Sequence, residues 1–425
     1  MIYLVHIFIA LNLFAAAFAG ALYSKRLRRI PAVSFFYFGW SLAGQVLALP
    51  LLILTLISLF VALFTIQLSF TIVIINFATL ALFCLTLLRS WQASQLLSQV
   101  AADRKNASFT RFLIGALFPF QLPKRDVKRI KNIAYGPSGQ KNKLDIYMPK
   151  TKPELPMPVL VHIHGGGWVV GRKHQQAKPL IQHMASKGWL VVDINYRLGP
   201  RNRMPAMIQD VLLSIAWVKT NIETYSGDPD FVAVTGGSAG GHLASLAALV
   251  SSVESLKPGF EQLDCAIDAC VPVYGVYDFR QCDDVGNDDE RNDGIQAFQS
   301  FLSKAVMPGP TEKHQALWEQ VSPMAQIHPD APPMLITHGR HDALVSLASA
   351  KAFAENLSQI SSNKVIFVEL PSAQHAFDIA YAPPTPEHVR TVHRFLESVR
   401  VAKREVQKAV QKEVQKKRRK KSNNT

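Results

Sequence analysis

The chain has 425 residues, 48% of them hydrophobic, so it is long enough to bury at least one large core. Four cysteines in this length exclude a disulfide scaffold, and they lack the close pairs of a zinc or redox site. The formal net charge of +15 is uneven, because residues 1–131 carry +11, residues 400–425 carry +9 and the stretch between them carries −5. The basic charge therefore belongs to the flanks of a mildly acidic body.

The first 88 residues are the most apolar part of the chain. Residues 35–88 contain no charged side chain and are too long for one span of about 20 residues. We therefore predict three transmembrane helices, at about 2–23, 37–63 and 69–88. A cleavable signal peptide competes for the first, but its basic residues, which start at Lys25, follow the apolar run rather than precede it. A buried hairpin of a soluble core would need a polar face, which this stretch lacks.

Basic residues also predict an orientation for these spans. They follow the first span at 25–29 and the third span from Arg89 onward. By the positive-inside bias, three spans make the chain a multi-pass membrane protein with its catalytic domain in the cytoplasm. If the first span is cleaved or does not insert, the number of spans changes and the predicted side of the catalytic domain can change with it.

A basic connector, about 91–130, follows the membrane region, 1–90. Its apolar patch at 112–120 suits either a membrane-surface helix or part of a substrate-covering cap. From about 131 to 399, strand-like runs alternate with helix-length segments, which predicts a mostly parallel sheet flanked by helices. The runs lie at 143–147, 159–164, 190–195, 231–235, 266–274, 334–337 and 365–370, with helices at 204–222, 239–253 and 346–360.

The sharpest motif is the G-x-S-x-G segment at 236–240, in which Gly236 and Gly240 flank Ser238. It follows a strand-like run and precedes a helical one, as a nucleophile elbow requires. Small neighbours are needed because the turn is tight and exposes the serine hydroxyl.

A second motif, His164-Gly165-Gly166-Gly167-Trp168, begins where the 159–164 strand ends. Bare backbone N–H groups in such a loop can stabilise the negative oxygen of a tetrahedral intermediate. We assign these donors to Gly166 and Gly167, joined by the N–H of Ala239. Phosphate-binding spacing is absent.

A serine nucleophile needs a histidine base and an acid that orients the base, in the chain order Ser, Asp, His for this fold. Asp342 and His375 each follow a predicted strand, where α/β sheets place their sites. His338 precedes the acid on its own loop, and His242 is read as structural. His162 and His164 lack a third ligand for a metal.

From about 131 to 399 the chain resembles the hormone-sensitive-lipase-like carboxylesterases of the α/β-hydrolase superfamily. The resemblance rests on HGGGW at 164–168, NYRLGP at 195–200, VAVTGGSAGG at 232–241, the His338-Gly segment with Asp342, and His375. It implies an α/β-hydrolase fold with an eight-stranded type of sheet, the triad Ser238, His375 and Asp342, and the oxyanion hole named above. The family's Asp before the serine is Gly237 here, and its Glu after YRLxP is Arg201, which leaves the subfamily and the substrate open.

A cap insertion is expected at about 278–330. Its acidic segment does not match a calcium-binding loop, so we read it as a solvated cap loop. Apolar residues nearby can line an acyl pocket or simply pack the cap: Phe298, Phe301, Val306, Met307 and Trp318. No metal or organic cofactor is expected.

The basic tail, 400–425, carries valines every four residues and predicts a cationic helix. A solvated helix and attraction to an anionic lipid surface both remain open, whereas nucleic-acid binding is not expected. The whole sequence predicts a membrane-attached serine ester hydrolase of the esterase or lipase type, acting on an apolar or lipid-derived ester. The alternatives are a serine peptidase or amidase of the same fold, and a non-catalytic membrane scaffold.

Overall fold

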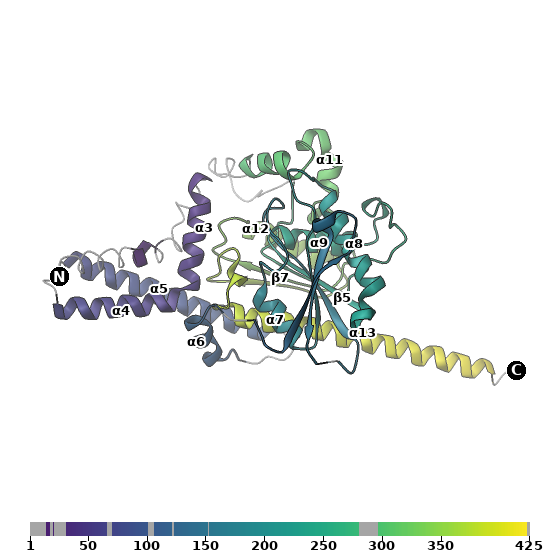
Figure 1. The fold of residues 1–425 in the computed structure, drawn as a ribbon, viewed down its shortest axis with the longest axis horizontal. Helices are drawn as coiled ribbons and strands as arrows, with labels where there is room; N and C mark the ends of the chain where they lie inside the picture. The colour runs from purple at the N-terminus through teal and green to yellow at the C-terminus, as the bar shows by residue number, and fades with distance from the viewer. Residues whose placement is uncertain are drawn as a thin grey trace.

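A computed structural model describes residues 14–17, 20, 31–65, 70–100, 106–120, 123–151, 153–279 and 296–422. Within them lies an eight-stranded sheet of order β1-β2-β4-β3-β5-β6-β7-β8 (Figure 1). β2 is antiparallel to its neighbours β1 and β4, and the remaining pairs are parallel. The strands are β1 (Val127–Ala134), β2 (Lys143–Pro149), β3 (Met157–Ile163), β4 (Leu190–Ile194), β5 (Gly227–Gly237), β6 (Ala269–Val273), β7 (Met334–Gly339) and β8 (Val365–Leu370).

Both faces of the sheet are covered by helices, so its central strands are apolar on both sides. On β3, Val159 and Val161 join the core beneath α8 (Ala206–Asn221), α9 (Ala239–Val250) and α12 (Leu347–Ile360). Leu160 points the other way and joins the core beneath α5 (Phe70–Val100), α7 (Lys178–Ser186) and α13 (Thr385–Ser422). The arrangement confirms the predicted α/β sandwich of a mostly parallel sheet between helices.

The predicted strands and helices correspond closely to the observed ones. Each of the seven predicted strand runs overlaps one of the strands β2 to β8, and the three predicted helices overlap α8, α9 and α12. The edge strand β1 lies where the basic connector was expected to end. Helix α6 (Phe109–Leu117) covers most of the apolar patch at 112–120.

The apolar N-terminal region differs from the prediction of three spans. The first predicted span lies outside the described residues, apart from 14–17 and 20. The second, 37–63, is divided between α3 (Pro31–Val46) and α4 (Ala48–Thr65), whose apolar parts meet at a bend of 78°. Pro50 accounts for the break, because it cannot donate to the Val46 carbonyl and its ring clashes with that group. Among the described helices, one alone is long and apolar enough to cross a membrane, over Val73–Val100.

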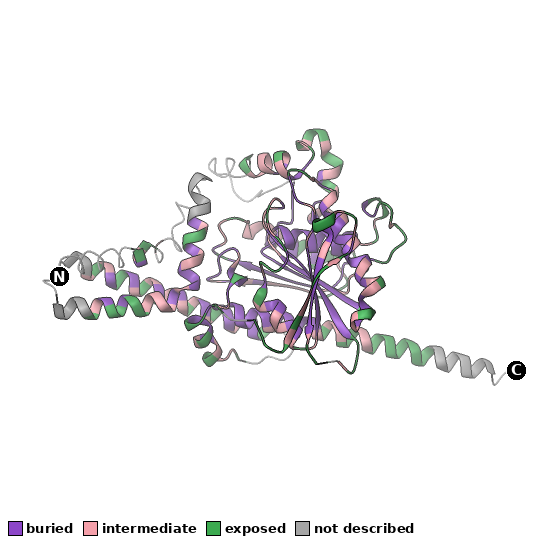
Figure 2. Cartoon of the chain, in the orientation of Figure 1, coloured by how far each residue is buried: buried purple, intermediate pink, exposed green. Residues whose placement is uncertain are grey.

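This helix, α5, belongs to two parts of the molecule at once. Its first half forms a hairpin with α4 that projects from the body (Figure 1). Many described residues of this hairpin are exposed (Figure 2), among them the apolar Ile57 and Phe77. Its second half runs past the predicted boundary at 90 into the sheet-containing domain, where Ala93 and Leu97 are fully buried. A hydrogen bond of 3.1 Å between the Ser90 and Ser372 hydroxyls reinforces this junction.

Candidate active site

Four loops converge at the carboxyl ends of neighbouring strands. The HGGGW segment follows β3, Ser238 follows β5, Asp342 lies just beyond β7, and His375 lies beyond β8. The sheet order places β3, β5, β6, β7 and β8 side by side, so these loops share one edge of the sheet. This edge is where α/β folds hold their sites.

Ser238 sits in the strained turn that its motif predicts. Its backbone φ of 57° is unusual for a side-chain-bearing residue, and its N–H donates to the Val273 carbonyl at 3.0 Å. The flanking glycines are required by close approach. A Cβ on Gly240 would lie 2.0 Å from the Ile163 carbonyl oxygen, and one on Gly236 would lie 2.5 Å from the Gly240 backbone.

The HGGGW loop packs directly against this turn. A Cβ on Gly165 would lie 3.2 Å from the Cβ of Ser238, and the Gly165 N–H donates to the Gln176 side chain at 2.7 Å. Gly166 and Gly167 have φ values of 117° and 57°, which favour glycine. None of the hydrogen bonds among the described residues uses the N–H of Gly166, Gly167 or Ala239. Ala239 opens α9, so its N–H also lies at the positive end of a helix dipole.

Asp342 and His375 form a buried pair. His375 Nδ1 lies 2.8 Å from Asp342 Oδ2, and the other carboxylate oxygen accepts the N–H groups of Leu344 and Val345 at 2.9 and 2.8 Å. Burial alone would raise the pKa of the Asp342 carboxyl, but the charge and hydrogen bond of His375 hold that pKa below its ordinary value. With Nδ1 directed at the carboxylate, Nε2 of His375 is the nitrogen left to act as a base.

The structure brings Asp342 and His375 together more closely than His375 and Ser238. Within the described residues, no hydrogen bond joins the Ser238 hydroxyl to His375. Tyr274 lies at their junction: its ring centroid is 4.6 Å from that of His375, and a Cβ on Gly237 would lie 2.6 Å from its hydroxyl. Catalytic hydrogen bonds are often loose without substrate, so this geometry remains compatible with a triad.

Two side chains outside the proposed triad, those of His338 and Tyr274, also belong to this neighbourhood. His338 Nε2 lies 3.3 Å from Asp342 Oδ2, and burial lowers the pKa of its imidazole. Tyr274 donates its hydroxyl to Asp378, whose pKa is raised by burial. His338 was visible in the sequence four residues before the acid, whereas Tyr274 gave no signal beyond its position after a strand.

Three further histidines near the loops have buried partners outside the proposed triad. His164 stacks on Tyr196 at 4.4 Å, and burial lowers its pKa to about 4. Trp168 donates its indole N–H to His242, whose pKa burial lowers to about 3. His162 is hydrogen-bonded to Asp193 at 2.7 Å. Among the described residues, no group of three or more His, Cys, Asp or Glu side chains could hold a metal ion.

The connection from β6 to β7 passes beside the HGGGW loop in its described part. Its acidic segment lies outside the described residues. Val306, Met307 and Trp318 are fully buried in the main core, which identifies them as packing residues. Phe301 instead approaches the HGGGW loop, where its ring would lie 3.6 Å from a Cβ on Gly167. Phe301 is therefore the member of the predicted apolar set that lies beside the assigned oxyanion donors.

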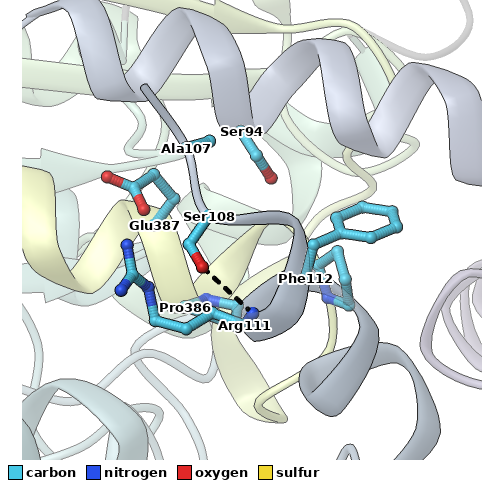
Figure 3. Close-up of a pocket in the computed structure, with 8 residues that line it drawn as sticks. Ser94, Ala107, Ser108, Arg111, Phe112, Pro386 and Glu387 are labelled. Carbon is cyan, nitrogen blue, oxygen red and sulfur yellow. Dashed lines mark hydrogen bonds between the residues drawn. The ribbon is translucent and has the colours of Figure 1, made fainter. Parts of the chain in front are cut away.

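A small hollow elsewhere on the surface is not part of this site. It lies where α6 meets α5 and the start of α13 (Figure 3), and its lining contains none of the predicted catalytic side chains. Ser108 caps α6 there by accepting the Arg111 N–H at 3.4 Å. The residues that line it are Ser94, Ala107, Ser108, Arg111, Phe112, Pro383, Pro386 and Glu387. We read this hollow as a packing gap between helices.

The family model described as BD-FAE matches residues 144–357, just over half of the chain. The chain belongs to the BD-FAE family. The match spans the sheet from β2 to the helix before β8 and includes the HGGGW loop, Ser238 and Asp342, whereas His375 lies beyond it. The predicted resemblance to hormone-sensitive-lipase-like enzymes thus holds at the level of the fold and of esterase relatives, while the matching family is BD-FAE.

Curated relatives and solved structures agree with this assignment. The chain is 42% identical over 279 residues to a probable carboxylic ester hydrolase, LipM, of Mycobacterium tuberculosis, covering 65% of this chain and 62% of LipM. It is 41% identical to Esterase LipQ of the same organism, covering 60% of this chain and 59% of LipQ. The chain thus spans about three fifths of the length of these relatives.

The solved structures support the fold. Esterase B from Lactobacillus rhamnosis superimposes with a TM-score of 0.56 at 23% identity, covering 76% of this chain and 98% of that structure. A truncated carbohydrate esterase from gut microbiota gives a TM-score of 0.55 at 23% identity, covering 66% and 99%. Together with the observed sheet, these similarities establish an α/β-hydrolase fold for this BD-FAE member.

Proposed function

We propose that this protein is a serine carboxylic-ester hydrolase with Ser238 as nucleophile, His375 as base and Asp342 as the acid that orients it. The observation that carries the proposal is the strained Ser238 turn beside a glycine loop, on the same sheet edge as the hydrogen-bonded Asp342–His375 pair. The BD-FAE match and the esterase relatives support it.

The proposed reaction follows from this geometry. His375 Nε2 takes the Ser238 proton as the hydroxyl oxygen attacks the ester carbonyl carbon, and the carbonyl oxygen becomes an oxyanion. The N–H groups of Gly166, Gly167 and Ala239 stabilise that charge. As the ester C–O bond breaks, the protonated histidine gives its proton to the leaving alcohol, and the acyl group stays bound to the Ser238 oxygen. Water, activated by the same histidine, releases the acid and restores the serine.

The proposed substrate class is an apolar or lipid-derived ester, and the proposed location is the membrane. Ile57 on α4 and Phe77 on α5 are 55% and 60% exposed on a hairpin that projects from the body. Water is a poor solvent for such a surface, whereas a bilayer covers it. Both ends of the hairpin lie on the side of the domain, so both would lie on the same side of the bilayer. Arg89 lies at that end, and basic residues next to a span favour the cytoplasmic side, so we propose a cytoplasmic domain.

The test is Ser238→Ala, compared with Ser252→Ala beyond the C-terminal end of α9. We expect the wild type and Ser252→Ala to hydrolyse chromogenic acyl esters and to react with a fluorophosphonate probe. Ser238→Ala should do neither while unfolding at the same temperature. Full activity in Ser238→Ala would refute the mechanism. Cleavage of peptide amides in preference to esters of every acyl length would favour the peptidase alternative, and a wild type without either activity would favour a scaffold.

A further inference from the structure

Gln374 connects the two loops that carry the proposed acid and base. The residue directly precedes His375 and is fully buried. Its side-chain oxygen accepts two backbone N–H groups, that of Ala343 at 2.7 Å and that of His375 at 2.8 Å. Ala343 directly follows Asp342, so a single oxygen fixes the backbone on both sides of the Asp342–His375 hydrogen bond.

The other polar groups of Gln374 are bonded to the apolar N-terminal helix α3. Its side-chain nitrogen donates to the Ser41 hydroxyl at 2.5 Å, and its backbone N–H donates to the Gln45 side-chain oxygen at 2.8 Å. Ser41 and Gln45 are four residues apart, so they project from one face of the helix. Both are buried, with exposed fractions of 0% and 4%.

Neighbouring residues on α3 also contact the segment around His375. One turn before Ser41, the ring of Phe38 meets the His375 imidazole edge-on, with centroids 6.0 Å apart. One residue after Gln45, Val46 packs against Ala380 and Ala382, just beyond the His375 loop. These contacts continue along α3 over about two turns.

The polar pair Ser41 and Gln45 limits where the mostly apolar helix α3 can pack on the domain. Buried amide and hydroxyl groups are costly when they lack partners, and here each finds its partner on Gln374. The hydrogen bonds therefore select one position of α3 on the domain. Because Gln374 holds both catalytic loops, that position also determines how firmly the acid and base are held.

We propose that Gln374 is a positioning residue for the Asp342–His375 pair and that α3, through Ser41 and Gln45, is a structural part of the active site. The inference rests on the proposed function, since it concerns the turnover of the same triad. It gives the apolar N-terminal region a role in catalysis as well as in membrane attachment.

The test uses the full-length protein in detergent with a short-chain, soluble chromogenic ester. The variants are Ser41→Ala, Gln45→Met and Gln374→Met. The matched control is Thr55→Val on α4, whose hydroxyl donates to the Leu51 carbonyl of its own helix at 2.7 Å. We expect kcat to fall about 10- to 100-fold in the three variants, because small displacements of catalytic groups have effects of this size. KM and the unfolding temperature should change little, and Thr55→Val should behave as wild type.

A double variant distinguishes positioning from general stabilisation. If Ser41 acts through the Gln374 side chain, adding Ser41→Ala to Gln374→Met should lower kcat by less than twofold further. Wild-type kcat in Ser41→Ala and Gln45→Met, or losses that follow a lowered unfolding temperature, would overturn the positioning role and leave the proposed function intact. A wild type that neither hydrolyses esters nor reacts with fluorophosphonate would overturn both.

Discussion

At the scale of single residues, the carboxylate of Asp342 is the group whose role can be tested with the smallest change. It holds His375 Nδ1 at 2.8 Å and accepts two backbone N–H groups. Asp342→Asn keeps the shape but can direct an N–H at the imidazole, which favours the wrong tautomer. We expect kcat to fall by roughly 10³- to 10⁴-fold with KM nearly unchanged, measured on the same esters.

The control for this change is Asp330→Asn, an exposed carboxylate before β7. It should leave kcat at the wild-type value. A loss of less than about threefold in Asp342→Asn would mean that another group orients the base.

The sequence indicated the residues of the proposed triad but not the side chains that hold them. Ser238, Asp342 and His375 lie in motifs or directly after strands, where a local pattern carries the information. Gln374 and Ser41 are separated by more than 300 residues, and nothing in either segment indicates the other. A contact of this kind depends on how a helix docks onto the finished domain, which no local periodicity encodes.

At the scale of elements, a buried and an exposed position of α5 should respond differently to the same substitution. Leu97 is fully buried under the sheet, whereas Leu88 is 60% exposed on the same helix. Leu97→Ala should lower the free energy of unfolding by about 2–5 kcal/mol, because it leaves a cavity. Leu88→Ala should change it by less than about 0.5 kcal/mol. Urea unfolding in detergent, followed by tryptophan fluorescence, measures both, and equal effects would show that α5 is not part of the domain core.

Hydrophobicity predicted where the apolar runs lie but not where the helices end. The run of uncharged residues stops at Leu88, yet α5 continues to Val100 because its next turns pack on the sheet. The second predicted span contained Pro50, and the chain bends just before it. β1 was missed because its lysines and arginine break the apolar alternation that identifies a buried strand, as an exposed edge strand allows.

At the scale of the whole molecule, buried neutral histidines make stability depend on pH. His388 is buried, and burial lowers its pKa to about 4 from an ordinary value of 6.5. Between these values the unfolded chain binds a proton that the folded chain does not, so stability falls as pH decreases from about 6.5 to about 4. A shift of this size corresponds to roughly 3 kcal/mol.

The variant His388→Gln cannot take up that proton. Its free energy of unfolding should therefore decline less steeply than that of the wild type between pH 6.5 and pH 4, when both are measured by urea unfolding. Parallel curves for the two proteins would refute the assignment. The half-buried His328, changed to Gln, offers a second histidine substitution for comparison.

The α4–α5 hairpin and the basic tail lie far apart, so membrane insertion of the hairpin and lipid attraction of the tail are separate hypotheses. The α4–α5 hairpin projects from one side of the domain, and the cationic end of α13 projects from the other (Figure 1). A bilayer that contains the hairpin would lie away from the tail, so the structure gives no support to attraction of the tail to that same bilayer. The hairpin has the length for the task, because the 18 residues of α4 extend over about 27 Å.

Membrane insertion of this hairpin can be tested by placing charge on its exposed apolar face. We expect Ile57→Arg combined with Phe77→Arg to weaken membrane association, since each arginine in a hydrocarbon core costs about 2.5–3.5 kcal/mol. The matched control is Val401→Arg combined with Val406→Arg, which alters two exposed valines of α13 and should leave association unchanged. Alkaline extraction of membranes measures the association of both double variants. If both double variants stay equally membrane-bound, something other than the α4–α5 hairpin attaches the protein. The orientation is tested by a reporter fused after Thr425, which should behave as cytoplasmic. A reporter that behaves as external would reverse the predicted orientation.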